Sequence, residues 1–336
     1  MRDSYNLTRR SVLGQVLAGL TASLAATGTS WAQDAYPSRP ITVLHGYPPG
    51  GGGDFTARTI ANRMQKSLGQ PLVVENLGGA GGTIAVNKLL SAPPDGYTTL
   101  IGTLNENLLA PMQMAAVRYK SEDMRLVGQC VDSYLVLFTR PDLPVNSVQD
   151  LVALAKSRGD KPLTCGHLGR GSAWHLAAER FAQEAGVKLL HVPYRGAAQL
   201  FPDIVAGNVD MSFTALGGPA VGMVKEGKVK ALAFAAPARN PSLPNVGTFD
   251  ESGLFKNFVF NYWAGLMVQS AMPEPIVQKL HAALNEALND PQVRKTLSDG
   301  GLLPVQSTTL AESSKYFASE IVRYRTIAKS INLQPE

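Results

Sequence analysis

The stretch "ITVLHGYPPGGGGDFTARTIANRM", residues 41–64, contains a predicted strand, a glycine loop and the start of a helix. The apolar run 41–46 is typical of a buried strand, and four consecutive glycines, Gly50 to Gly53, follow soon after it. Asp54 is the predicted N-cap of the helix, and Gly69 is its predicted end. The apolar residues of this helix share one face: Ala57, Ile60, Ala61, Met64 and Leu68. A glycine loop that opens a helix presents unpaired backbone N–H groups, so this stretch predicts an anion-binding site.

The same order of strand, loop and helix recurs along the chain. We predict strands at 41–46, 71–76, 97–103, 134–139, 163–167, 189–194, 209–214, 230–236 and 261–269. We predict helices at 54–69, 81–92, 148–157, 172–186, 274–290 and 310–331. Alternation of strands and helices predicts parallel sheets with right-handed crossovers. Because proline removes a hydrogen bond inside a helix, we expect a helix to start near Pro202, after a loop at 195–200.

Four glycine or polar loops follow predicted strands, where ligands bind in open α/β sheets. They are "PPGGGGD" (48–54), "NLGGAGGT" (76–83), "GTLNEN" (102–107) and "CGHLGRGSAW" (165–174). None matches a nucleotide-binding motif, since Asp54 stands where a phosphate-binding lysine would be needed. "GRGSAW" lacks the second glycine of a hydrolase elbow, so Ser172 is interpreted as a helix N-cap whose hydroxyl could also contact a ligand.

The histidines and cysteines predict neither a metal site nor redox chemistry. Cys165, His167 and His175 lie close together in the sequence, but their spacing matches no standard zinc motif, so we predict no metal. The chain has two cysteines, Cys130 and Cys165, and no Cys-x-x-Cys motif. We expect two isolated buried thiols, although the sequence leaves a disulfide between them open.

Length, charge and the N-terminus indicate an exported protein of two domains. The chain has 336 residues, and 45% of them are hydrophobic, enough for two cores. Residues 1–32 are predicted to be a signal peptide, with paired Arg9 and Arg10, an apolar run at 12–26 and cleavage near Ala32. The paired arginines favour the twin-arginine route, and a Sec signal is the alternative. In either case we predict a periplasmic protein.

Removal of the signal peptide changes the net charge little. The formal net charge is +5, and residues 1–32 contain three arginines and one aspartate, so 28 basic and 25 acidic residues remain, a net charge of +3. That excess is too small to indicate nucleic-acid binding, but it fits an anionic small-molecule partner.

Seven ordered motifs resemble one known family, the periplasmic solute-binding proteins of tripartite tricarboxylate transporters, also called the Bordetella uptake gene family. The motifs are "YPSRPITVLHGYPPGGGGDFTAR", "GQPLVVENLGGAGG", "PPDGYTTLIGT", "VPYRGAAQ", "AGNVDMSF", "YWAGLMV" and "DPQVRKTLSDGGLLP". The resemblance implies a type II periplasmic-binding-protein fold, with two α/β lobes joined by two crossing strands. It implies lobe 1 at 36–132 and 261–336 and lobe 2 at 133–260, with crossings near 132–135 and 261–263.

The resemblance also implies a function and a set of ligand contacts. The lobes would close on a small carboxylate, with no cofactor and no catalysis, and deliver it to membrane permease subunits; we expect a monomer. In lobe 1 the contacts would come from Gly50, Gly51, Gly52, Gly53, Asp54, Phe55, Gly81, Gly82, Thr83, Thr103 and Asn105. In lobe 2 they would come from His167, Gly169, Arg170, Gly171, Ser172, Trp174, Tyr194, Arg195, Gly196 and Thr214.

Three departures from the family pattern bear on the ligand. Gly53 replaces a common Thr, His167 a small hydroxyl residue, and Thr214 a common Asp. Loss of that Asp argues against an amino acid, while His167, Arg170 and Trp174 favour an aromatic or dicarboxylic acid. A periplasmic sensor or scavenger with the same fold is the alternative function. An enzyme is disfavoured, because no pair of nucleophile and base can be assigned.

Overall fold

The computed structural model describes residues 36–330, and the predicted signal peptide lies outside the described residues. The chain divides after Ser38 into two units. In the described part of the first unit, the peptide bond between Tyr36 and Pro37 is cis. Everything that follows concerns the second unit, from Arg39 onward.

Strands and helices alternate through most of the second unit. Its strands are β1 (Ile41–His45), β2 (Leu72–Asn76), β3 (Thr98–Thr103), β4 (Met124–Thr139), β5 (Leu163–His167), β6 (Leu189–Pro193), β7 (Met211–Ala215), β8 (Lys230–Ala235), β9 (Asn261–Gln269) and β10 (Leu303–Pro304). Its α-helices are α2 (Gly52–Leu68), α3 (Thr83–Ser91), α4 (Ala110–Gln113), α5 (Val148–Ser157), α6 (Ala173–Ala185), α7 (Ala197–Val205), α8 (Ala220–Lys225), α9 (Glu274–Asn289), α10 (Pro291–Asp299) and α11 (Leu310–Ser330). Short 3₁₀ or π turns are η1 (Ala80–Gly82), η2 (Asn105–Leu109), η3 (Ser121–Asp123) and η4 (Asp250–Ser252).

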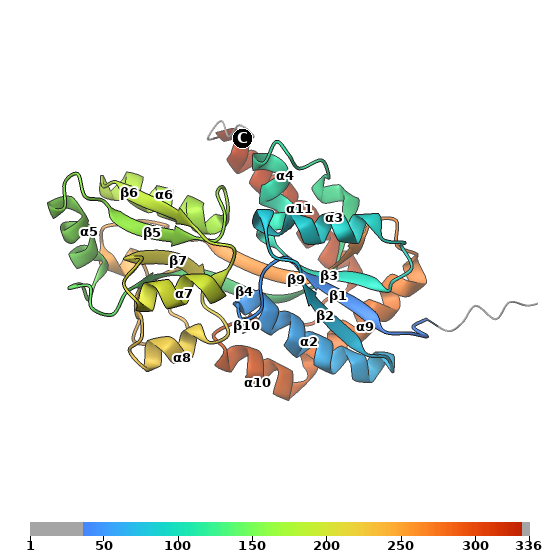
Figure 1. Cartoon of the computed structure of the whole chain (residues 1–336). Coiled ribbons are helices and arrows are strands. Elements are labelled where there is room, and N and C mark those ends of the chain that lie inside the picture. The colour runs from blue at the N-terminus through green and yellow to red at the C-terminus, as the bar shows by residue number, and fades with distance from the viewer. Residues whose placement is uncertain (1–35, 331–336) are drawn as a thin grey trace, which may run out of the picture. The chain divides into compact units, whose positions relative to one another are not determined.

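One half of the sheet, which we call lobe 1 together with its helices, has the strand order β2-β1-β3-β9-β4. β1 is parallel to β2 and β3, as predicted, with Val43 opposite both Val74 and Thr99. β9 runs antiparallel to β3 and β4, which was not predicted. Helices α2 and α9 cover one face of this half, and α3 and α11 cover the other (Figure 1).

The other half, lobe 2, continues from β4 in the order β7-β5-β6, and β8 also pairs with β4. β5 is parallel to both β6 and β7. Helix α6 lies over one face, and α7 and α8 lie on the other (Figure 1). Five phenylalanines pack in its core: Phe181, Phe213, Phe249, Phe255 and Phe258.

The long strand β4 belongs to both lobes. From Met124 to Tyr134 it pairs with β9, and from Leu135 to Thr139 it pairs with β7 and β8. The chain returns to lobe 1 at the start of β9, directly after Phe260, whose N–H donates to the Ala235 carbonyl at 2.9 Å. Two neighbouring antiparallel segments therefore join the lobes.

Helix α2 follows the predicted apolar face but not the predicted N-cap. All five predicted face residues are buried, and Gly69 ends the helix in the left-handed conformation, with φ of 69°. The helix begins at Gly52, however, with Gly51 as N-cap. Asp54 is the third helical residue, and its carboxylate accepts a hydrogen bond from the Gly50 N–H at 3.0 Å. The prediction that Asp54 is the N-cap was wrong, because flexible glycines let the N-cap lie three residues earlier, at Gly51.

Helix α7 also begins earlier than predicted. It starts at Ala197 and contains Pro202, so the expected loop at 195–200 is wrong. Leu200, Phe201 and Ile204 are at most 6% exposed, and a helix is needed to bring all three to one buried face. Pro202 and Ala198 are both exposed, so water can replace the hydrogen bond that proline does not donate.

Both cysteines are buried and unpaired, which confirms the prediction of two isolated thiols. Burial raises the pKa of each thiol to about 12. Within residues 36–330, no helix has the length and apolar character needed to cross a bilayer.

Candidate ligand-binding site

The lobes meet at the glycine loop that opens α2. A Cβ atom on Gly217 of lobe 2 would lie only 2.9 Å from the Cα of Gly52. Cβ atoms on Gly50 and Gly51 would lie 3.8 Å from the side chains of Ala198 and Ala197, at the start of α7. Glycine at 52 and 217 therefore allows backbone from the two lobes to approach closely, whereas a Cβ at Gly50 or Gly51 would make only an ordinary contact.

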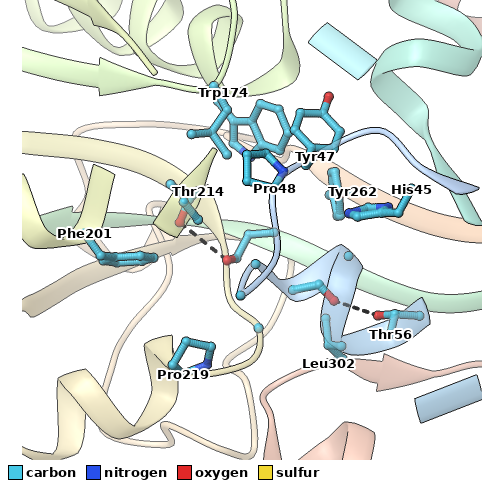
Figure 2. Close-up of a pocket in the computed structure, with 18 of the residues that line it drawn as sticks. His45, Tyr47, Pro48, Thr56, Trp174, Phe201, Thr214, Pro219, Tyr262 and Leu302 are labelled. Atoms are coloured by element: carbon cyan, nitrogen blue, oxygen red, sulfur yellow. Dashed lines mark hydrogen bonds between the residues drawn. The ribbon is translucent and has the colours of Figure 1, made fainter. Parts of the chain in front are cut away.

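Behind this contact lies an inner cavity of about 40 Å³. In Figure 2, Trp174, Tyr47 and Pro48 gather on one side of it, and Thr214 and Phe201 project from lobe 2. The residues that line it are His45, Tyr47, Pro48, Gly50 to Gly53, Thr56, Val131, Leu168, Trp174, Ala197, Phe201, Thr214, Ala215, Gly217, Pro219, Tyr262 and Leu302. None of them is Lys, Arg, Asp or Glu, and burial lowers the pKa of His45, which favours its neutral form.

Two helices begin at the inner cavity, one from each lobe. Gly51 to Gly53 of α2 and Ala197 of α7 line it, and neither N-cap residue, Gly51 or Gly196, provides a side-chain cap. The first N–H groups of a helix have no acceptor within the helix, and they carry partial positive charge. The cavity can therefore hold an anion by backbone donors from both lobes without a charged side chain.

An aromatic wall closes the cavity. The ring of Trp174 lies edge-on to Tyr47, with centroids 5.5 Å apart, and 5.6 Å from Tyr262. The Trp174 Nε1 is buried without a hydrogen-bond partner, and the Tyr47 hydroxyl donates to the Gly81 carbonyl at 3.1 Å. Sequence reasoning selected Trp174 and missed the two tyrosines. Both stand in motifs quoted above, so the available signal was an aromatic residue just after β1 and another at the start of β9.

The turn after β3 contains a buried carboxylate, that of Glu106. The Thr103 N–H and hydroxyl donate to Glu106 at 2.6 and 2.5 Å, and burial raises the pKa of Glu106 to about 7. The Oδ1 of Asn105 accepts a hydrogen bond at 2.9 Å from the N–H of Ala173, the first residue of α6 in lobe 2. Thr103 and Asn105 were predicted to contact ligand, and neither lines the inner cavity. The Thr103 hydroxyl is bonded to Glu106, whereas the Nδ2 of Asn105 is buried without a hydrogen-bond partner.

Asp54 also faces the protein rather than the cavity. Burial alone would raise its pKa, but hydrogen bonds from Arg58, the Gly50 N–H and Asn76 outweigh that effect and lower it. Asp54 therefore fixes the shape of the glycine loop. The neighbouring Phe55 packs toward Gly218 and Gly300 and does not line the inner cavity.

A second, outer pocket of about 470 Å³ lies between the other glycine loops. Gly79 to Gly81 and Gln113 line it from lobe 1, and Gly169 to Gly171, Tyr194 and Arg195 line it from lobe 2. Arg170 and Arg195 are exposed. Leu168 lines both this pocket and the inner cavity.

The remaining residues that were predicted to contact ligand lie in different parts of the structure. Ser172 is the N-cap of α6, as predicted, and lines a small cavity of about 10 Å³ with Asn105. Gly82, Thr83 and Gly196 line neither larger cavity. His167, Arg170 and Trp174, predicted to act together, are separated. Trp174 lines the inner cavity, Arg170 lines the outer pocket, and His167 lines neither, because its ring packs against His175 and His191.

This arrangement agrees with a comparison to known families. The model of the tripartite tricarboxylate transporter family receptor matches residues 56–333. The chain belongs to this receptor family. Members of the family are solute-binding receptors and not enzymes.

Solved structures show the same fold. The receptor is similar to the periplasmic binding protein BugD, with 30% identity, a TM-score of 0.83 and coverage of 90% of this chain and 100% of the other. It is also similar to MatC from Rhodopseudomonas palustris, solved with bound malate, with 32% identity, a TM-score of 0.80 and coverage of 87% and 99%. A second R. palustris protein, solved with adipate, has 28% identity, a TM-score of 0.82 and coverage of 90% and 100%. These similarities confirm the predicted two-lobed binding-protein fold.

Proposed function

We propose that this receptor captures a small organic acid between its lobes in the periplasm and delivers it to the permease subunits of a tripartite tricarboxylate-type transporter. The observation that carries the proposal is the inner cavity, where α2 and α7 begin from opposite lobes and no charged side chain is present. A carboxylate there would accept N–H groups from both lobes. Binding would then favour the closed arrangement over an open one.

The crossing segments are where we expect the lobes to move. β4 changes partners between Tyr134 and Leu135, and the chain enters β9 at Asn261. Bending at these two neighbouring points would open both cavities without unfolding either lobe. Residues 1–32 would direct export and then be removed, and the receptor would act as a monomer.

For the ligand we propose an aromatic or dicarboxylic acid. A water molecule needs roughly 10–15 Å³ by the same measure, so the inner cavity of about 40 Å³ has room for a carboxylate group but not a whole dicarboxylate. The rest of the ligand would extend past Leu168 toward Arg170 and Arg195, or along Trp174 if it is a ring. The malate and adipate seen in the two R. palustris relatives are acids of this kind.

A screen of purified protein against small acids tests the proposal. The panel contains benzoate- and phthalate-type acids, C4 to C6 dicarboxylates, tricarboxylates and amino acids, with hits confirmed by calorimetry. A ligand at a hundred times its dissociation constant should stabilise the protein by about 2.7 kcal/mol, which thermal unfolding detects easily. Binding of aromatic or dicarboxylic acids supports the proposal, binding of amino acids alone overturns the ligand class, and silence from every acid overturns carboxylate capture.

A separate experiment tests whether Arg170 contacts the second carboxylate of a dicarboxylic ligand. Arg170→Ala should weaken binding of a dicarboxylate by roughly 10- to 150-fold, since a hydrogen bond to a charged group contributes about 1.5–3 kcal/mol. Binding of the matching monocarboxylate should not change. Arg158→Ala, at the end of α5 and lining neither cavity, is the matched control. Equal affinity of Arg170→Ala for every acid would remove this residue from the site.

A further inference from the structure

Three of the five histidines in the chain lie together in lobe 2. His167 ends β5, His175 lies in the first turn of α6, and His191 lies in β6, which pairs with β5. One ring nitrogen of each lies within 4.8 Å of one from each of the others. Centroids of the three rings are 4.7 to 5.7 Å apart. The fold therefore brings together three side chains that are distant in the sequence.

Two of these rings have buried nitrogens without a hydrogen-bond partner. His167 is 3% exposed, and the Nδ1 atoms of His167 and His191 are both unpartnered. A buried polar atom left unpaired destabilises the folded protein, so such atoms in a native protein call for an explanation.

A carboxylate supports the cluster from its outer side. Glu179, one turn after His175 on α6, lies 3.0 Å from the Nε2 of His191 and 3.4 Å from the Nε2 of His175. A metal-binding histidine usually donates its other ring N–H to a carboxylate or a backbone carbonyl. His191 has this arrangement, with its Nε2 toward Glu179 and its Nδ1 unpartnered. His175 accepts a hydrogen bond from the Gly171 N–H at its Nδ1, so this bond must break or its Nε2 must serve as the ligand.

We propose that His167, His175 and His191 bind one first-row transition cation of the zinc type, with Glu179 orienting the histidines or completing the coordination. Imidazole suits zinc, copper and nickel, whereas Mg²⁺ and Ca²⁺ prefer oxygen ligands. Nitrogens around a tetrahedral zinc lie about 3.4 Å apart, so the rings must move together by roughly 1 Å. Arg170 is the cation that opposes binding, and Glu179 is the anion that favours it.

No metal was predicted from the sequence, because the spacing of Cys165, His167 and His175 matches no standard zinc motif. The cluster in the structure contains His191 instead of Cys165, and these two residues stand opposite each other in the β5–β6 register. The site lies next to the outer pocket, since His175 lines that pocket and Gly171 bonds to its ring. A bound cation would therefore fix the 169–171 loop, one wall of the pocket. This inference does not depend on which acid the receptor binds.

Calorimetric titration of ZnCl₂ into the protein tests the proposal, using protein purified without a polyhistidine tag and freed of metal with EDTA. We expect one Zn²⁺ per chain and a higher unfolding temperature with zinc. His191→Gln should weaken zinc binding at least tenfold, and Glu179→Gln should weaken it about 10–100-fold, the usual effect of losing an outer partner. His281→Gln is the matched control, because His281 lies in α9 and bonds to the Val127 carbonyl.

A measurement on the unmodified protein keeps the test independent of whether the variants fold. Cobalt(II) in place of zinc should give the intense visible absorption of a four-coordinate site, and X-ray absorption should show imidazole scattering from about three rings. The absence of stoichiometric binding, an oxygen-only shell, or equal zinc affinity in His191→Gln and His281→Gln would each overturn the site.

Discussion

Replacing Gly217 with alanine should prevent the lobes from closing fully. Gly217 lies between β7 and α8, and its added Cβ would lie 2.9 Å from the Cα of Gly52 and 3.2 Å from the Leu302 side chain. Its φ lies outside the left-handed region, so alanine imposes no backbone strain of its own. The clash with Gly52 exists only while the lobes are together. The substitution should therefore act on closure rather than on the folding of either lobe.

The size of the effect follows from this distance. Carbon atoms pack best at about 3.5–4.0 Å, so the lobes must separate by roughly 0.6–1 Å or strain must be accepted. Overpacking of this kind costs about 1–3 kcal/mol. Expressed as affinity, that cost weakens ligand binding by about 5- to 150-fold.

Calorimetry with the acid found in the screen measures this loss, and small-angle scattering of the ligand-saturated protein should show a less compact form. Gly222→Ala is the matched control, since a Cβ at Gly222 in α8 meets nothing within 4 Å. It should leave affinity unchanged. The reasoning is refuted if Gly217→Ala binds as tightly as the original protein, because the observed approach would then not be a feature of the ligand-bound form.

Three further predictions concern lobe 1. Gly53→Thr, which restores the residue common in the family, should destabilise folding by about 1–3 kcal/mol, since a Cβ there would lie 2.8 Å from the Nε2 of His45. In denaturant unfolding, the double variant Gly53→Thr/His45→Ala should recover part of this lost stability. Strictly additive effects of the two substitutions on stability would contradict the clash. Because burial raises the pKa of Glu106 to about 7 from 4.5, the folded state binds the proton more tightly, and stability should fall as pH rises from about 4.5 to 7. Glu106→Gln should flatten the dependence of stability on pH in this range. An unchanged slope would show that another group causes the dependence. Asp54→Asn should lower the stability of the fold by about 1–3 kcal/mol and weaken acid binding, because the charge that holds the Gly50 N–H is lost. Unaltered binding would show that the hydrogen bond from Gly50 to Asp54 is not needed for the glycine loop to bind the acid.

Local patterns predicted much of the fold because each depends on neighbouring residues. The strand at 163–167 and the helix at 148–157 have the predicted bounds, since alternation and helical spacing are complete within each segment. The first ten residues of β4 were not assigned, because their partner β9 lies more than 120 residues away along the chain. Pro202 misled the prediction, because a helix can tolerate it when water replaces the lost bond.

The candidate site was only partly predictable, for a related reason. A glycine loop is a short local motif that indicates a backbone-lined site, and Gly50 to Gly53 do line the inner cavity. Tyr262 reaches the same cavity from a strand two hundred residues later, and no local pattern indicates that. Sequence also cannot tell which polar side chains are already engaged. Thr103 has the chemistry of a ligand contact, yet Glu106 occupies both its donors.

The hydrogen bond between Asn105 and the N–H of Ala173 joins the two lobes through groups that belong to the chain itself. It contributes to closure whatever the cavity contains, by about 0.5–1.5 kcal/mol for an ordinary hydrogen bond. That corresponds to roughly a two- to twelvefold larger closed population, and apparent affinity rises with the fraction of receptor that is competent to bind. The same bond must break before the lobes separate and release a ligand. If the receptor delivers its ligand to a permease as proposed, the Asn105 amide would therefore raise affinity and slow release at the same time.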